Sequence, residues 1–129
     1  DTKRSIIVSS NDGMDEISVS DITYATLLIN GKITDIEINP EDYGIPIASK
    51  DDILGEGPEF NAKLTRDILS KKIVGAKLDI VLLNAEAALI VNEKARDCKD
   101  GIEMARWAIV SGAAQEKLEQ IIKVSQQLS

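Results

Sequence analysis

The sequence predicts an α/β domain in which a strand-rich segment, residues 1–48, precedes a helical segment, residues 49–129. In the first segment apolar residues alternate with polar ones, as in half-buried strands, whereas in the second they recur every three or four residues, as on one face of a helix. Glycine, asparagine and proline separate the runs. A length of 129 residues suits one domain, with about four short strands followed by about four helices.

The first two strands are expected on either side of a turn. Residues 5–8 form a short run of β-branched side chains, and the following "SSNDG" supplies the Asn, Asp and Gly that favour a turn. Beyond the turn, Ile17, Val19 and Ile22 are interspersed with Ser and Asp. This alternation predicts a second strand over residues 17–22.

Residues 23–40, "TYATLLINGKITDIEINP", are typical of a β-hairpin. Asn30 and Gly31 form the favoured two-residue turn, with apolar residues on both limbs. Asp35 interrupts strict alternation between Ile33 and Ile36, which indicates either a bulge or an uncertain register.

Helical signals begin near residue 49. Ser49 is placed to cap a short helical turn, with Asp52 in the capping-box position, and Pro58 suits the first position of a helix through about residue 72. The apolar stripe of that helix predicts that it faces the core. The stripe consists of Phe60, Leu64, Ile68 and Leu69.

Three further helices are expected towards the C-terminus. Residues 77–94 are apolar on nearly every side, which predicts a central helix buried between layers. A third helix should cover about residues 99–110 and end near Ser111 and Gly112. The fourth carries Leu118, Ile121, Ile122 and Leu128.

Composition excludes several classes of function. A formal charge of −7, from 22 acids against 15 bases, opposes nucleic acid as a partner. The absence of histidine excludes a Cys/His zinc site and a histidine-containing catalytic triad, and the single cysteine, Cys98, excludes an internal disulfide and is interpreted as a spectator thiol. The longest apolar run, residues 80–91, is too short to span a membrane, so a cytoplasmic protein without a membrane partner is expected.

The acidic pair Asp15 and Glu16, just past a glycine turn, admits two interpretations. Adjacent carboxylates suit a magnesium ion, but such a dipeptide beside a turn is more often only solvated. Asp12 could be a third acid in the site, although an Asx turn is favoured. Within the apolar helix, we expect Asn84 to pair with a neighbouring loop and Glu86 to point to a different face, towards an interdomain surface.

Six stretches in order carry a resemblance to a known family: "DGMDEIS", "INPEDYGI", "FNAKLTRDIL", "VLLNAEAAL", "GIEMARWAI" and "SGAAQEKLEQI". From about residue 5 to residue 128 the chain resembles the C-terminal part of the anthranilate phosphoribosyltransferases, enzymes of tryptophan biosynthesis. "DITYATLL" departs from the family's more usual Gly-Pro-Thr segment and keeps only Thr23. The resemblance implies part of an α/β domain of the phosphoribosyltransferase and nucleoside-phosphorylase type.

The resemblance also implies a function. It makes Asp15 and Glu16 ligands of the Mg²⁺ that accompanies phosphoribosyl pyrophosphate, and it names anthranilate as the second substrate. The family's Gly-Thr-Gly-Gly-Asp pyrophosphate loop and its helical N-terminal domain, through which the parent enzyme would form a homodimer, have no counterpart in residues 1–129. Because the chain also starts with Asp1 in place of methionine, we expect a C-terminal fragment, inactive alone.

Two other functions are kept open beside that interpretation. One is a non-catalytic binding relative of the same fold, which would need a basic face if its ligand were nucleic acid. The other is a pyrimidine-nucleoside phosphorylase, which the stretches "GMDEIS" and "LNAEAAL" do not favour.

Overall fold

The computed structural model describes residues 2–128, in which three strands are followed by four α-helices, with two short 3-10 turns between them. The strands form an antiparallel sheet in the order β1-β2-β3. Their bounds are β1 Arg4–Ser10, β2 Thr23–Ile29 and β3 Lys32–Ile38, and the turns are η1 Pro40–Tyr43 and η2 Lys50–Asp52. The helices are α1 Pro58–Leu69, α2 Ala76–Val91, α3 Cys98–Val110 and α4 Ala113–Gln127. The predicted α/β class is confirmed.

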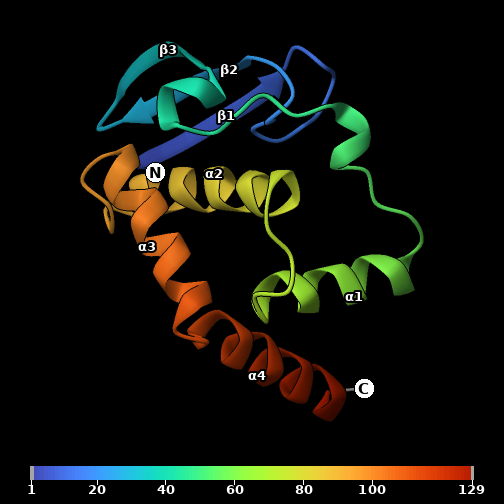
Figure 1. The fold of residues 1–129 in the computed structure, drawn as a ribbon. Helices are drawn as coiled ribbons and strands as arrows, with labels where there is room; N and C mark the ends of the chain where they lie inside the picture. The colour runs from blue at the N-terminus through green and yellow to red at the C-terminus, as the bar shows by residue number, and fades with distance from the viewer. Residues whose placement is uncertain (1, 129) are drawn as a thin grey trace.

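Helix α2 lies between the sheet and the other helices. Figure 1 shows it directly beneath the sheet, with α1 and α4 farther away on the other side. Leu83 and Ala87 of α2 pack into one core with the sheet and its loops, while Leu82 packs into a second core with Ile68 of α1 and Ile109 of α3. The prediction of a central helix buried between layers is therefore confirmed.

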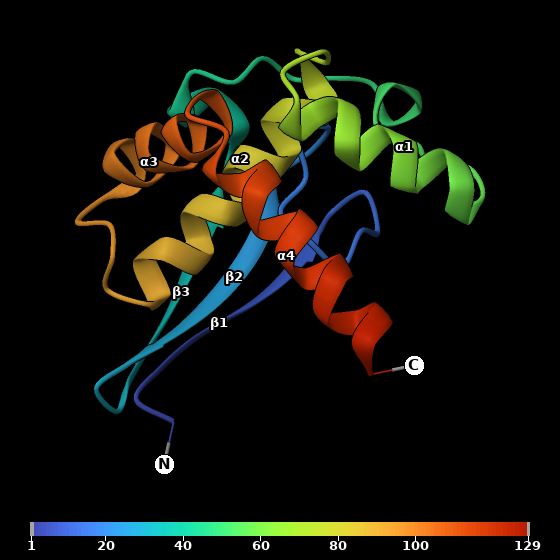
Figure 2. The same cartoon turned by 90° about the horizontal axis from the view of Figure 1, so that it is seen from below.

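All four helices lie on one side of the sheet, as the view from below shows (Figure 2). On the opposite face, Ile7 is 70% exposed, Tyr24 51% and Ile33 68%. None of the helices within residues 2–128 is long and apolar enough to cross a membrane.

The hairpin is confirmed, but the bulge is not. Asn30 and Gly31 both have positive φ, as a type I′ turn requires, and Ile29 pairs with Lys32 across it. Pairing then continues one to one through Thr26 and Asp35 to Thr23 and Ile38. The irregular sequence pattern has a simple cause: β3 is exposed along its whole length except at Ile38, so burial does not impose alternation on it.

The prediction of a strand over residues 17–22 is wrong. These residues form a loop, although Ile17, Ser18 and Val19 are almost fully buried. Side chains satisfy part of their backbone: the N–H of Ser18 donates to Thr23 Oγ1 at 3.0 Å, and that of Ile17 donates to a side chain of α2. Another loop supplies a further bond, because the Val19 carbonyl oxygen accepts from the Ala48 N–H at 2.9 Å. An alternating sequence shows which residues are buried, but it does not show whether a strand or a side chain completes their hydrogen bonds.

The expected helix starts agree with the structure. Ser49 and Asp52 form the capping box of η2, and Pro58 opens α1. Most of the stripe of α1 faces the core, since Ile68 is buried and Leu64 and Leu69 pack against the same cluster. Its first member, Phe60, is 40% exposed. Helix α4 forms as expected but contains no buried residue.

Candidate functional site

The candidate site is the loop that joins β1 to β2, here called the acidic loop, residues 11–22. It opens with a tight turn in which the N–H of Met14 donates to Asp12 Oδ1 at 3.1 Å. Gly13 has a φ of 87°, a conformation that favours glycine. The Asx turn predicted at Asp12 is confirmed.

Hydrogen bonds from within the loop hold the second carboxylate oxygen of Asp12. Ser18 Oγ donates to Asp12 Oδ2 at 2.7 Å, and Ser20 Oγ donates to the same atom. Partial burial alone would raise the pKa of Asp12, but the hydrogen bonds from these serines and from the Met14 N–H outweigh it and lower the pKa well below its usual range. The carboxylate of Asp12 therefore stabilises the loop, which favours the Asx turn over a role as a third metal ligand.

Two side chains distant in the sequence help to tie the acidic loop to the rest of the fold. Lys50 Nζ donates to the backbone oxygen of Asp12 at 2.8 Å. Asn84 of α2 accepts a hydrogen bond from the Ile17 N–H at 3.0 Å and donates one to the Ile17 carbonyl oxygen at 2.8 Å. The expectation that Asn84 pairs with a neighbouring loop is confirmed, and that loop is the acidic one.

Asp15 and Glu16 lie between these anchors. Asp15 is exposed and Glu16 is half-buried. Burial raises the pKa of Glu16, and the negative charges of Asp15 and Asp12 raise it further. Neither acid takes part in the ion pairs found within residues 2–128. Two adjacent, unpaired carboxylates are thus held at a site of concentrated negative charge.

This donor set suits one kind of metal site. No group of three or more metal-ligating residues occurs in the described part of the chain. Magnesium needs no such group, because one or two carboxylates commonly hold it while water and substrate phosphate complete its octahedral coordination. Asp15 and Glu16 therefore fit Mg²⁺ and do not fit a metal that requires several nitrogen or sulfur ligands.

A second polar group lies elsewhere and is formed by half-buried Tyr43 and Cys98 with buried Glu86. Glu86 is only 4% exposed, and a Cβ added at Gly101 of α3 would lie 2.7 Å from its Cγ. Burial raises the pKa of Glu86 more than its hydrogen bond with Cys98 lowers it. Within this chain Glu86 faces α3, so the expectation that it points to an interdomain surface is not met.

The thiol of Cys98 is not activated. Burial and the neighbouring Glu86 raise its pKa, and they outweigh the opposing hydrogen bond with Tyr43. A thiol of raised pKa is a poor nucleophile at neutral pH. The interpretation of Cys98 as a spectator is consistent with this environment.

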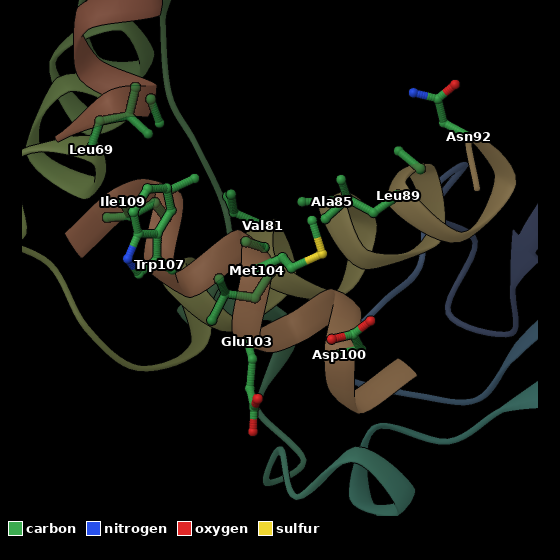
Figure 3. A pocket seen from close by; sticks show the side chains of 15 residues that line it. Leu69, Val81, Ala85, Leu89, Asn92, Asp100, Glu103, Met104, Trp107 and Ile109 are labelled. Carbon is green, nitrogen blue, oxygen red and sulfur yellow. The ribbon is translucent and has the colours of Figure 1, made fainter. Parts of the chain in front are cut away.

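The sequence did not reveal an apolar groove of about 830 Å³ between α2 and α3. In Figure 3, Met104 and Trp107 of α3 lie beside Val81 and Ala85 of α2, while the carboxyl group of Glu103 points away. Trp107 is 68% exposed. The groove contains no residue of the acidic loop. One sequence feature could have indicated the groove. Residues 77–94 are apolar on nearly every side, and the neighbouring elements in this chain do not cover all of that apolar surface.

Comparison with known proteins supplies a family. The model described as "Glycosyl transferase family, a/b domain" matches residues 1–115. Anthranilate phosphoribosyltransferase from Rubrobacter xylanophilus is 38% identical over 127 residues, which are 98% of this chain and 37% of that protein. The enzyme of the same name from Rhodopseudomonas palustris strain BisB18 is 45% identical over 119 residues, 92% of this chain and 35% of that protein. The chain thus spans little more than a third of these relatives.

Solved structures give the same result. Anthranilate phosphoribosyltransferase from Saccharomyces cerevisiae in complex with 4-fluoroanthranilate has a TM-score of 0.86 and 25% identity, covering 93% of this chain and 35% of that one. The enzyme from Thermus thermophilus has a TM-score of 0.78 and 31% identity, covering 91% and 34%. A variant of the yeast enzyme with Mg bound has a TM-score of 0.84 and 26% identity, covering 93% and 35%.

Proposed function

The chain belongs to the glycosyl transferase family of α/β domains, and from this premise we propose that it is the C-terminal part of an anthranilate phosphoribosyltransferase. The whole protein would transfer phosphoribose from phosphoribosyl pyrophosphate to anthranilate in tryptophan biosynthesis. The observation that carries the proposal is the extent of the match, because a relative of that name aligns with 98% of the chain at 38% identity.

Within this function Asp15 and Glu16 would hold the Mg²⁺ that accompanies phosphoribosyl pyrophosphate. When bound, Mg²⁺ neutralises the charge that develops on the pyrophosphate as its bond to ribose breaks. Both carboxylates can accept a cation without first breaking an ion pair within residues 2–128. The yeast relative with Mg bound supports the choice of metal.

The negative net charge of the chain gives a second reason for a bound cation at Asp15 and Glu16. At −7 the chain repels a pyrophosphate-bearing substrate. A cation held by Asp15 and Glu16 reverses that repulsion locally, where the substrate must bind. No nucleophilic side chain is required, because anthranilate itself supplies the attacking amine.

The remaining properties of the whole protein rest on the family resemblance. We propose that it acts in the cytoplasm and forms a homodimer through a helical N-terminal domain. That domain and the pyrophosphate loop would have to come from outside residues 1–129, so these residues alone should lack activity.

The test uses the complete polypeptide encoded by the reading frame that contains this chain. We expect it to consume anthranilate only when phosphoribosyl pyrophosphate and Mg²⁺ are present. Consumption is monitored as the loss of anthranilate fluorescence. The double variant Asp15→Asn, Glu16→Gln should raise the Mg²⁺ concentration for half-maximal rate by about ten-fold or more, because it removes both carboxylate ligands.

A charge-matched control separates ligation from general electrostatics. Glu116→Gln, Glu119→Gln also removes two negative charges, but from exposed positions on α4. This control should keep the wild-type Mg²⁺ requirement. A folded wild-type protein without transferase activity would contradict the proposal and would favour the non-catalytic binding relative.

A further inference from the structure

Asn84 makes an unusual set of contacts for a residue in the middle of a helix. Its side-chain oxygen accepts a hydrogen bond from the Ile17 N–H at 3.0 Å, and its amide nitrogen donates to the Ile17 carbonyl oxygen at 2.8 Å. The same nitrogen also donates to the Ile80 carbonyl oxygen at 2.9 Å, within α2. Asn84 therefore pairs with both backbone groups of Ile17, as a neighbouring strand would.

These contacts matter because of where Ile17 lies. It directly follows Glu16, it is 1% exposed, and it belongs to no strand. On the other side of the acidic pair, the Asx turn of Asp12 fixes the backbone at Met14. Asp15 and Glu16 thus lie between two anchored residues. The Met14 carbonyl oxygen accepts a hydrogen bond from the Ser10 N–H of β1 at 3.0 Å, and Asn84 of α2 holds both backbone groups of Ile17.

We propose that Asn84 is a positioning residue for the acidic pair, one that sets the affinity of the loop for Mg²⁺ by fixing the backbone at Ile17. The inference rests on the proposed function, since it takes Asp15 and Glu16 as the metal ligands. No hydrogen bond or ion pair within residues 2–128 orients their side chains, so their placement depends on the backbone that carries them and, for half-buried Glu16, on packing. Ligands held in place before binding lose less conformational entropy when the ion arrives.

The chain offers a matched control in Asn61 of α1. Its side-chain oxygen accepts a hydrogen bond from the Glu56 N–H at 3.1 Å, and its amide donates to the Glu56 carbonyl oxygen at 3.3 Å. This asparagine thus makes the same pair of bonds to one backbone residue. That residue, Glu56, lies outside the acidic loop. Asn61→Ala removes the same two bonds to one backbone residue as Asn84→Ala, at a more exposed position and without the third bond to Ile80.

The first experiment measures metal binding without turnover. In the complete polypeptide, with phosphoribosyl pyrophosphate present, bound Mn²⁺ is counted by the loss of its free electron paramagnetic resonance signal beyond the loss that the same concentration of phosphoribosyl pyrophosphate causes without protein. We expect Asn84→Ala to weaken Mn²⁺ binding about ten-fold, the size typical of losing a residue that orients a metal ligand. Asn61→Ala should bind Mn²⁺ as the wild type does.

A second variant guards against misfolding. A serine at position 84 can donate to the carbonyl four residues earlier in its own helix, so Asn84→Ser keeps a bond to Ile80 and loses both bonds to Ile17. It should weaken Mn²⁺ binding to a similar degree. Hydrogen exchange should accelerate across residues 14–18 in both Asn84 variants, while the exchange of α2 itself stays slow.

The outcomes separate the inference from the function beneath it. If the wild type binds Mn²⁺ and is active, but both Asn84 variants bind the ion equally well, the positioning role is wrong and the transferase assignment stands. If Asn61→Ala weakens binding as much as Asn84→Ala, the effect is general destabilisation and the inference also fails. If the wild type neither binds Mn²⁺ nor transfers phosphoribose, the proposed function itself is overturned.

Discussion

The acidic loop and helix α4 differ in a way that separates burial from regular structure. The loop has no helix or strand, yet Ile17 is 1% exposed, and Ser18 and Val19 are fully buried. Helix α4 is regular over 15 residues, yet none of them is buried. Hydrogen bonds from side chains and from other loop backbone satisfy the backbone of the acidic loop, whereas α4 satisfies its own backbone but has little to pack against within the described chain. The free energy of folding should therefore depend more on the loop than on the helix.

Paired alanine substitutions give the largest expected effect. Ile17→Ala should lower the free energy of unfolding of the chain by about 3 kcal/mol, because it opens a cavity in a filled core. Ile121→Ala, at a position 58% exposed on α4, should change it by less than about 0.5 kcal/mol. Urea denaturation followed by circular dichroism measures both. Similar losses for the two variants would show that α4 is packed as well as the loop.

Asp12→Asn tests whether hydrogen bonds hold the loop together. It should cost about 2 kcal/mol at neutral pH, since hydrogen bonds to a charged acceptor are stronger than those to a neutral one. Because the folded state lowers the pKa of Asp12 from 3.8, its stabilisation is present above that value and is lost as pH falls through the lower, folded-state pKa. The difference between wild type and variant should therefore shrink in acid.

Asp35→Asn provides the control for Asp12. Asp35 is exposed on β3 and accepts one hydrogen bond, from Thr26 Oγ1 at 2.6 Å. The control variant should lose much less stability, because water can replace that bond. A loss as large as that of Asp12→Asn would mean that the serine contacts add nothing to the loop.

The parts of the fold that follow from local chemistry could be predicted from the sequence. Asn30-Gly31 permits the positive φ values of its turn, and Ser49 and Asp52 carry their own capping bonds. Local chemistry could not show that residues 17–22 form a loop. The side chain that takes the place of a neighbouring strand at Ile17 is Asn84, which lies 67 residues farther along the chain.

The candidate site was predictable to a similar extent. The sequence located Asp15 and Glu16 beside a turn and placed Asp12 in that turn. It could not show that the two acids lack partners in the described chain while Asp12 is fully engaged, because the serines that bind Asp12 are ordinary loop residues by type. The apolar residues around Glu86 predicted a buried helix, but not that Glu86 itself is covered, since that depends on how closely α3 approaches at Gly101.

Glu86 is buried and also lies in a regular helix. Changing it should have the smallest effect on stability, but the effect separates burial from regular structure most selectively. If burial matters more to stability than regular structure does, an ionised Glu86 should destabilise the fold even though it lies in a well-formed helix. The folded state raises the pKa of Glu86, so its protonated form stabilises the fold below the ordinary value of 4.5, and that stabilisation is lost as pH rises through the folded-state pKa. Glu86→Gln should be more stable than wild type at pH 8, by less than the Ile17 and Asp12 changes, and the gain should vanish near pH 4. Thermal unfolding across this range measures it, with exposed Glu103→Gln as the control. A gain that is independent of pH would mean that packing against Gly101, and not the buried charge, governs this position.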